Sequence, residues 1–369
     1  MSKIPALVIG GGPAGSVAAM RLARAGLRTL LVERCAEGHD PVCGGFVSAD
    51  ALRLLDQAGI ETRALGGHPI DKVRLIVAGR TIEAGLPFPA IGLSRRRLDG
   101  ALIAAARAAG AGIEHGQTAR AFLPDTRIVS FADGSRIAAD AIILATGKLN
   151  LRGIDRPGDS RRGEPMVGLR ITLRPEQASA AALSRTIELH TFAGGYAGLV
   201  MQEDESFNLC LSVTARRLRD AEGSPEQLLT SLVDEAPVLA ERFASGQPLG
   251  GWRSIARIPY GWHAPDTSPG LFRVGDQAAV IASLAGDGIA IAVASATMAS
   301  DALIRGGPEA SRKYQRDFAA SARRPLAFAE MLRAVAEKPA WARPASRLLR
   351  FQPRALAWAA VATRITATA

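Results

Sequence analysis

The sequence predicts an α/β protein in which a dinucleotide-binding domain is interrupted by an antiparallel sheet and followed by a helical segment. The chain opens with a short apolar run at residues 4–9 that ends in a glycine-rich turn. Its middle third has the alternating residues of antiparallel strands, and the pattern of a buried strand returns at residues 271–274. This order is typical of a nucleotide-binding domain that carries an inserted substrate domain.

The first thirty residues predict a β-α-β unit. The apolar run at residues 4–9 predicts a strand buried on both faces. Pro13 stands where proline suits the first turn of a helix, which we expect over residues 13–25. Residues 27–32 predict a second buried strand, closed by Glu33. Strand, helix and strand in this spacing indicate a dinucleotide-binding domain.

The remaining elements follow from apolar periodicity and turn residues. Helices are expected at residues 48–58 with Ser48 as N-cap, 98–109, 225–235, 238–243 and 289–304. We expect a hairpin at 73–77 and 81–83, an antiparallel meander over 113–137, and strands at 141–145, 167–173, 186–191, 198–202, 208–214, 252–258 and 271–274. Cofactor binding is assigned to residues 1–70, 94–164 and 266–305, and the substrate domain to 71–93 and 165–265.

The C-terminal segment, residues 306–369, carries most of the net charge. The chain has 45 basic and 35 acidic residues, a formal charge of +10, of which +9 lies after residue 304. Helical patterns at 311–337 and 343–366 interleave apolar residues with Arg. The preferred interpretation is a helical cap that packs on the substrate domain and exposes its Arg heads to water, and the alternative is an interfacial helix on an anionic membrane. Nucleic-acid binding lacks any motif.

No signal peptide and no apolar run of about 18 residues is visible. We therefore expect a cytoplasmic protein, with peripheral membrane contact through the C-terminal segment as the alternative. Three cysteines without a C-x-x-C pair exclude a zinc ribbon and a disulfide scaffold, and no metal site is expected.

The glycine-rich turn fits G-x-G-x-x-G, with the sequence Gly10-Gly11-Gly12-Pro13-Ala14-Gly15. Gly10 allows the tight turn, Gly12 lets the backbone approach a pyrophosphate, and Gly15 lets the helix pack closely on the strand. The free N–H groups of the helix N-terminus face the phosphates. Glu33 can accept hydrogen bonds from ribose hydroxyls, and Arg34 is expected near the adenine.

Three further segments resemble flavoprotein hydroxylases. Ser94-Arg95-Arg96-Arg97-Leu98-Asp99 resembles their R-x-x-[FL]-D helix start, Ala145-Thr146-Gly147 their A-T-G segment, and Gly275-Asp276 with Gly286-Asp287-Gly288-Ile289 their G-D motif and following turn. Together these motifs resemble the para-hydroxybenzoate hydroxylase / geranylgeranyl reductase superfamily. This resemblance implies a Rossmann-like FAD-binding domain of the glutathione-reductase-type two-dinucleotide fold.

In that superfamily the Asp holds the ribityl chain and the following turn presents N–H groups to the flavin. The resemblance and the glycine motif together imply an FAD site. Its expected residues are Gly10, Gly12, Pro13, Ala14, Gly15, Glu33, Arg34, Arg95, Ala145, Gly147, Gly275, Asp276, Gly286, Gly288 and Ile289. A second G-x-G-x-x-G is missing, so NADH or NADPH is expected as a transient electron donor.

The residues found at the motif positions of related flavoproteins narrow the reactions that this protein is expected to catalyse. Ser48 replaces the second cysteine of the disulfide reductases, which disfavours dithiol chemistry. Gly194-Gly195-Tyr196 resembles the start of the geranylgeranyl reductase substrate motif, but Gly198 replaces its Trp. We therefore favour the related monooxygenases, which hydroxylate lipophilic aromatic or polyketide-like molecules. Reduction of isoprenoid C=C bonds and a non-catalytic flavin-binding protein remain the alternatives.

The catalytic residues stay unknown from the sequence. Polar candidates in the substrate sheet are His190, Tyr196 and Arg170, and Tyr260 and Cys43 are candidates near the flavin. An ordinary structural role competes for each: a satisfied His, a core aromatic, or a small buried Cys.

Overall fold

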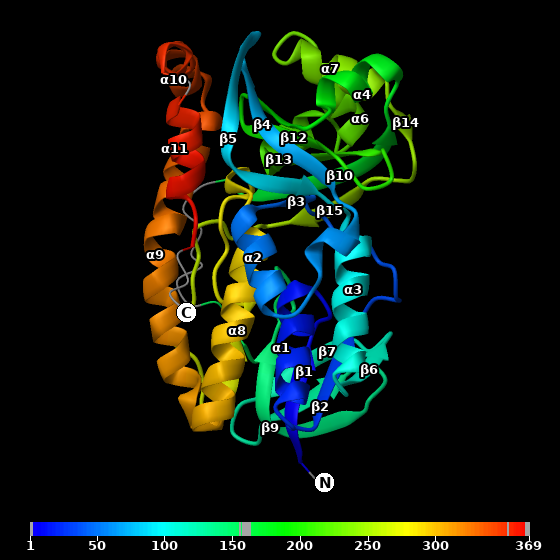
Figure 1. The fold of residues 1–369 in the computed structure, drawn as a ribbon, viewed down its shortest axis with the longest axis vertical. Coiled ribbons are helices and arrows are strands. Elements are labelled where there is room, and N and C mark those ends of the chain that lie inside the picture. The colour runs from blue at the N-terminus through cyan, green and yellow to red at the C-terminus, as the bar shows by residue number, and fades with distance from the viewer. Residues whose placement is uncertain (1–2, 155, 157–163, 353, 366–369) are drawn as a thin grey trace.

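The computed structural model describes residues 3–154, 156, 164–352 and 354–365. Two sheets occupy the two halves of an elongated molecule, and the C-terminal helices run along one flank (Figure 1). The α/β prediction is confirmed. Residue 366, the predicted end of the last helix, lies outside the described residues.

The first sheet is built around the predicted β-α-β unit. Its five parallel strands lie in the order β6 (Gly112–His115), β2 (Thr29–Glu33), β1 (Ile4–Ile9), β9 (Arg136–Leu144) and β16 (Leu271–Arg273). Two antiparallel strands extend it from β9, namely β8 (Ile128–Phe131) and β7 (Ala119–Leu123). The predicted meander is therefore wrong at its start, because β6 pairs in parallel with β2. The half-exposed edge position of β6 gives it the alternation that suggested a meander.

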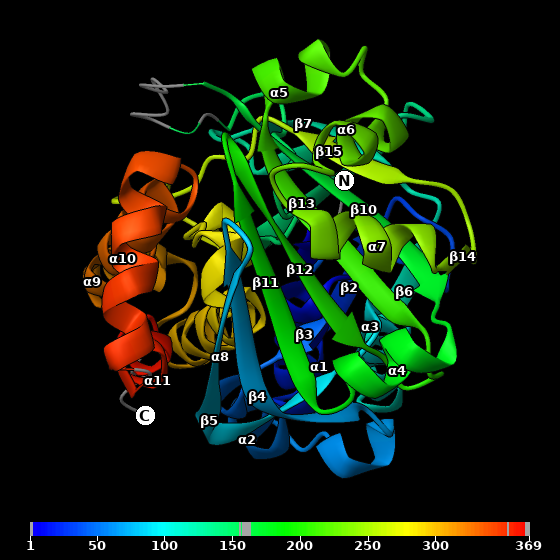
Figure 2. The ribbon, with the colours of Figure 1, turned by 90° about the horizontal axis from the view of Figure 1, so that it is seen from above.

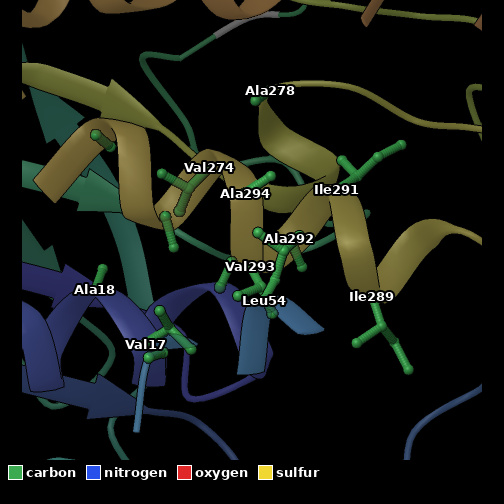
Figure 3. Close-up of a cluster of buried hydrophobic side chains, with 14 of the residues drawn as sticks. Val17, Ala18, Leu54, Val274, Ala278, Ile289, Ile291, Ala292, Val293 and Ala294 are labelled. Carbon is green, nitrogen blue, oxygen red and sulfur yellow. The ribbon is translucent and has the colours of Figure 1, made fainter. Parts of the chain in front are cut away.

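Helices α1 (Pro13–Arg24), α2 (Ala49–Gln57), α3 (Arg95–Ala108) and α8 (Gly288–Gly306) pack with this sheet around one core. In Figure 3, Val17 and Ala18 of α1 lie beside Val293 of α8 and Leu54 of α2. Helix α8 is long and apolar enough to span a membrane, but most of it is buried inside this fold. Such burial is typical of the core helix of a soluble protein.

The second sheet is mixed, whereas the sequence predicted an antiparallel one. Its order is β14 (Gln247–Pro248), β10 (Met166–Arg174), β13 (Phe207–Thr214), β12 (Gly195–Met201), β11 (Thr186–Phe192), β4 (His68–Val77), β5 (Arg80–Gly92) and β3 (Phe46–Val47), with β15 (Arg253–Ala256) beside β10. Strand β11 runs parallel to β4. The long chain between these two strands passes through the first domain, which gives room for the crossover that a parallel pair needs.

The hairpin is also longer than predicted. Strand β5 continues past residue 83 to Gly92, through prolines at 87 and 89. The β4–β5 register jumps between Ile70 and Lys72, so residues 86–89 bulge out of the ladder. Prolines are tolerated there because the missing N–H groups have no ladder bond to make.

Helices cover one face of the second sheet. These are α4 (Gln177–Leu183), α6 (Pro225–Ser231) and α7 (Pro237–Ala244), with α5 (Ala215–Asp220) at the edge. The opposite face lies over the first domain (Figure 2). The sheet thus has one packed face and one face turned toward the cofactor motifs.

The C-terminal segment forms α9 (Ser311–Ala336), α10 (Pro339–Phe351) and α11 (Arg354–Ala362). Helix α9 runs beside α8 and buries Tyr314, Phe318 and Leu326 in the core of the first domain. The Tyr314 hydroxyl donates a 2.8 Å hydrogen bond to the Arg273 carbonyl. Helix α9 is therefore packed on the first domain, not on the substrate domain where the cap was expected, whereas α10 and α11 contact β5 of the second sheet.

Candidate active site

A cleft of about 830 Å³ lies between the two sheets. Fourteen of the fifteen predicted cofactor residues line it, although they come from five separate segments of the chain. The fifteenth, Gly15, lies behind the glycine turn. The carboxyl ends of β1, β2 and β9 open into the cleft, which is where open α/β sheets bind nucleotides.

Close packing explains the glycines of the turn. Gly10 has φ +108°, and a Cβ there would lie 2.4 Å from the Ala145 carbonyl oxygen. A Cβ on Gly15 would lie 1.8 Å from the Gly10 oxygen. Gly12 is the N-cap of α1 and offers no side-chain cap. The first N–H groups of α1 are therefore free to bind a pyrophosphate.

Glu33 sits at the end of β2 with its carboxylate beside the turn. Its Oε2 accepts a 2.6 Å hydrogen bond from Gly11 N, and its Oε1 accepts a 2.8 Å bond from Cys35 N. Both bonds fix the carboxylate where an adenosine ribose would follow the pyrophosphate. Arg34 lines the same part of the cleft.

Arg95 is held at the cleft by Asp99, one turn further along α3. Its Nε and Nη2 donate two 2.8 Å hydrogen bonds to the two carboxylate oxygens. Burial lowers the pKa of Arg95, but Asp99 outweighs burial and leaves the pKa above its ordinary value. A Cβ on Gly12 would lie 3.2 Å from Arg95 Nη2. A fixed cation therefore stands beside the phosphate-binding turn.

Lys148 is a site residue that the sequence analysis missed. Its Nζ lies 2.9 Å from Asp276 Oδ2, in the cleft. Burial lowers the pKa of Lys148, but the Asp276 carboxylate offsets burial and raises it overall. Asp276, predicted to hold the ribityl chain, thus already has a cationic partner. Its position in the sequence could have indicated this role, because Lys148 directly follows the A-T-G segment that lines the cofactor cleft.

Asp287, in the middle of the predicted flavin turn, is buried and has partners from distant segments. It accepts hydrogen bonds from Ser48 Oγ at 3.0 Å, Arg364 Nη1 at 2.7 Å and Ile365 N at 3.2 Å. Burial raises the pKa of Asp287, and Arg364 opposes that shift. The contact with Arg364, 77 residues away, could not be anticipated from the sequence motif.

Four hydroxyl groups gather next to this turn. Tyr260 OH lies 3.1 Å from Ser212 Oγ and 2.8 Å from Ser283 Oγ, and Tyr196 OH accepts a 3.0 Å bond from Leu284 N. Burial raises the pKa of Tyr196 well above its ordinary value, and the neighbouring Tyr260 adds to the shift. We call Tyr196, Ser212, Tyr260 and Ser283 the hydroxyl cluster. All four line the cleft.

The rest of the sheet face is apolar. Ile187, Leu189 and Val200 line the cleft beside Gly198. A Cβ on Gly198 would meet only Leu189, at 3.5 Å. The absence of a side chain at Gly198 therefore leaves space next to an apolar wall, which suits a lipophilic molecule. Cys43 lines the cleft on the first-domain side.

Two predicted candidates lie elsewhere. His190 faces the opposite side of the sheet, where its Nε2 lies 3.0 Å from Glu188 Oε1 and both side chains are fully buried. Arg170 is bonded to Asn208 and forms a 2.7 Å ion pair with Asp40, which fixes the loop before Cys43. Neither lines the cleft. His190 points away because the one-residue step from Leu189 exchanges the two faces of the strand, whereas Arg170 shares a face with Gly168 and is held by Asn208 and Asp40.

The described residues contain no group of three His, Cys, Asp or Glu side chains placed to hold a metal. Fold and cleft together define a dinucleotide-binding oxidoreductase with a separate substrate sheet. Residues 3–132 match the FAD binding domain family. The match and the cleft identify the chain as an FAD-dependent oxidoreductase. It is similar in sequence to proteins named as geranylgeranyl-type reductases and in fold to FAD-dependent monooxygenases.

Relatives span most of the chain. Digeranylgeranylglycerophospholipid reductase 2 of Methanopyrus kandleri is 27% identical over 303 residues, 77% of this chain and 72% of that protein. Menaquinone reductase of Mycobacterium tuberculosis is 26% identical over 80% of this chain and 76% of its own length. The structure of PqsL from Pseudomonas aeruginosa, a probable FAD-dependent monooxygenase, superposes with a TM-score of 0.73 at 18% identity, covering 92% and 99% of the two chains.

The site residues fit FAD. The glycine turn leaves room where a Cβ would close it, and Glu33 and Arg95 offer the acceptor and the cation that ribose and pyrophosphate need. The Gly286–Gly288 turn and the start of α8 present N–H groups and a positive helix end to the far end of the cleft. FAD bound in this cleft would therefore have backbone donors available at both ends.

Proposed function

We propose that this flavoprotein is a monooxygenase that hydroxylates a lipophilic aromatic or polyketide-like molecule. The observation that carries the proposal is the hydroxyl cluster at the end of an apolar wall, beside the flavin turn. A phenol needs both surfaces, because its ring is apolar and its hydroxyl group needs hydrogen-bond partners. The cluster offers donors and acceptors that rotate to suit such a group.

When bound, reduced FAD supplies the chemistry that activates dioxygen. In the proposed reaction one oxygen atom enters the product, the other leaves as water, and NADH or NADPH supplies two electrons. The substrate sheet excludes water with Ile187, Leu189 and Val200. Tyr260 and Tyr196 orient the substrate hydroxyl, and Ser212 and Ser283 hold the Tyr260 hydroxyl in place.

Reduction of isoprenoid C=C bonds is the second candidate. It is favoured by the sequence relatives, which are named as reductases of a prenylated phospholipid and of menaquinone. The same apolar wall would accept a polyprenyl chain. The hydroxyl cluster has no evident role in binding a chain without polar groups, and for this reason we rank hydroxylation first.

Oxygen consumption separates the candidates. Holoenzyme is mixed with NADH or NADPH in air and with a panel of alkylated phenols and prenylated lipids. We expect a phenol to stimulate oxygen uptake and to gain one atom of labelled oxygen from ¹⁸O₂. Anaerobic saturation of a prenyl double bond, without oxygen uptake, would instead establish the reductase. No turnover of either class would leave a non-catalytic flavin-binding protein.

The hydroxyl cluster can be tested by variants. Tyr260→Phe and Tyr196→Phe remove one hydroxyl each and are expected to lower the turnover of phenols about 10- to 100-fold while FAD stays bound. Tyr314→Phe is the matched control, because this buried hydroxyl bonds the Arg273 carbonyl and does not line the cleft. Unchanged turnover in both cleft variants would contradict the role of the cluster.

We also propose that the protein is cytoplasmic. The support is the burial of α8, the one described helix that is long and apolar enough to span a membrane. Fractionation of cells that express the chain tests this location: the protein is expected to be in the soluble fraction or to be released from membranes by high salt, as a peripheral protein would be.

A further inference from the structure

The C-terminal segment exposes an unusual share of the large apolar side chains. Eleven large hydrophobic residues are exposed among the described residues, and six of them lie between residues 331 and 361. These six are Met331, Trp341, Leu348, Phe351, Trp358 and Val361. Helices α10 and α11, which carry five of them, lie along the outer flank of the molecule in both views (Figures 1 and 2). Clustered exposed apolar residues mark interaction surfaces.

Helix α10 has one face packed against the rest of the protein and an apolar stripe on its outer side. Ala342 and Ser346 are buried against the body. Trp341, Leu348 and Phe351 are 62%, 69% and 79% exposed. Their spacing of seven and three residues places them on one side of the helix. The packing of α10 therefore uses one of its faces and leaves the other exposed among the residues that the structure describes.

A basic stripe runs beside the apolar one. Arg343, Arg347 and Arg350 are spaced by four and three residues and are exposed. At 100° per residue they lie next to Phe351 on the outer surface. None of the three forms an ion pair with the described residues, in contrast to Arg333 on α9. The outer surface of α10 thus carries an apolar stripe on one side and a stripe of Arg residues on the other.

Helices α10 and α11 carry no acidic residue of their own. The sequence has no Asp or Glu after Glu337, whereas six basic residues follow it. This surface is a helix face bordered by the exposed Arg343, Arg347 and Arg350, so its charge complements an anionic surface. Trp358 adds a second aromatic anchor on α11, seated edge-on against Phe328 with ring centroids 5.5 Å apart. Trp at an apolar–polar boundary is the residue type that favours a membrane interface.

We propose that the outer face of α10 and α11 docks on an anionic lipid bilayer. Trp341, Leu348 and Phe351 enter the boundary between headgroups and acyl chains, and the three Arg heads bind lipid phosphates. The inner face keeps its packing on the body, so docking requires no unfolding. This proposal does not depend on the reaction, because it rests on a surface outside the cleft.

Vesicle binding tests the proposal directly. The full-length holoenzyme is mixed with vesicles of phosphatidylglycerol and phosphatidylcholine, or of phosphatidylcholine alone, and bound protein is measured by flotation. We expect binding to the anionic vesicles that weakens with added salt, with a blue shift of tryptophan fluorescence. Arg343→Gln, Arg347→Gln and Arg350→Gln combined are expected to weaken binding roughly 100-fold, from about fivefold per cation.

Matched variants separate docking from folding. Trp341→Ser, Leu348→Ser and Phe351→Ser combined are expected to abolish binding while FAD content and thermal midpoint stay unchanged. Leu123→Ser, Val233→Ser and Leu249→Ser combined change three exposed apolar residues elsewhere on the molecule and are expected to bind like the wild type.

Three outcomes overturn the proposal: no binding of the wild type to anionic vesicles, equal binding by the Trp341/Leu348/Phe351 variant, or a concentration-dependent dimer that this variant alone abolishes. The last outcome would assign the face to a second copy of the chain.

Discussion

A single methyl group at Gly15 would collide with the turn that ends β1. The Cβ would lie 1.8 Å from the Gly10 carbonyl oxygen, which is backbone and cannot rotate away. We predict that Gly15→Ala separates α1 from β1, destabilises the fold by about 1–3 kcal/mol and loses FAD. Flavin absorbance of the purified protein and its thermal midpoint measure both effects. Gly250→Ala is the control, because a Cβ there meets nothing within 4 Å; equal flavin content in the two variants would contradict the prediction.

A second prediction concerns Glu188, on the far face of the sheet. Burial raises its pKa, but His190, Arg74 and Arg242 outweigh burial and lower it from 4.5 to about 2. Because the folded-state pKa is depressed, the ionised Glu188 stabilises the fold above pH 4.5, and this contribution is lost as the pH falls toward 2. The shift corresponds to about 3 kcal/mol.

Chemical denaturation between pH 3 and pH 7 checks this prediction. We expect Glu188→Gln to be less stable at pH 7 and to lose part of the acid dependence of the wild type. Glu83→Gln removes the other carboxylate on Arg74, 2.6 Å away but half exposed, and is expected to have a small effect. The idea fails if both variants show the same pH profile as the wild type.

The boundaries of individual helices and strands show how much the local sequence pattern can predict. The strand at Ile4–Ile9 and the N-cap Ser48, which accepts a hydrogen bond from Ala51 N, were predicted correctly. Strand alternation in β11 was also correct, but it did not reveal which face meets the cleft. His190 shares a face with Glu188, and the ion partner Arg242 on α7 lies on that side. Which face of a strand meets the cleft depends on the layer packed against the sheet, and the sequence of a single strand does not specify that layer.

A prediction at the scale of an element concerns the residues that follow α11. Arg364 pairs with the buried Asp287 and stacks 4.5 Å from the ring of Phe88. Arg364→Ala would leave a buried carboxylate without its cation, at a cost of about 3–5 kcal/mol. We expect weaker FAD binding and a lower thermal midpoint, measured by flavin release during heating.

Two variants define the specificity of that effect. Arg305→Ala removes an exposed cation in an i,i+4 pair and is expected to be neutral. Combining Arg364→Ala with Asp287→Asn removes the uncompensated charge and should recover part of the lost stability. If Arg364→Ala retains FAD as firmly as Arg305→Ala does, the C-terminal contact does not support the flavin turn.

At the scale of the whole molecule, α9 belongs to the first domain's core. A chain that ends at Arg305 would expose the apolar surface that Tyr314, Phe318 and Leu326 cover. We predict that this chain aggregates, whereas a chain that ends at Lys338 keeps α9 and stays soluble, but with the lower thermal midpoint and weaker FAD binding expected from the loss of Arg364. Size-exclusion chromatography of the two truncated chains is the measurement. Soluble, flavin-bound protein from the shorter chain would show that α9 is dispensable.

The sequence by itself determined the nucleotide half of this protein. The glycine turn, Glu33 and the short motifs around Arg95 and Asp276 can be recognised locally, because each is defined by residue types within a few positions of the chain. That is why fourteen predicted residues line one cleft. The net charge could likewise be assigned to the C-terminal segment by counting.

Only the tertiary structure decided which side chains meet at the substrate side. Tyr196, Ser212, Tyr260 and Ser283 come from four segments and converge because two sheets pack across a cleft. The Arg364–Asp287 pair and the outer face of α10 depend equally on how the C-terminal helices fold back. Such contacts join residues far apart in the chain, and no local periodicity specifies them. The cofactor could therefore be predicted from motifs, whereas the substrate pocket and the docking surface required the fold.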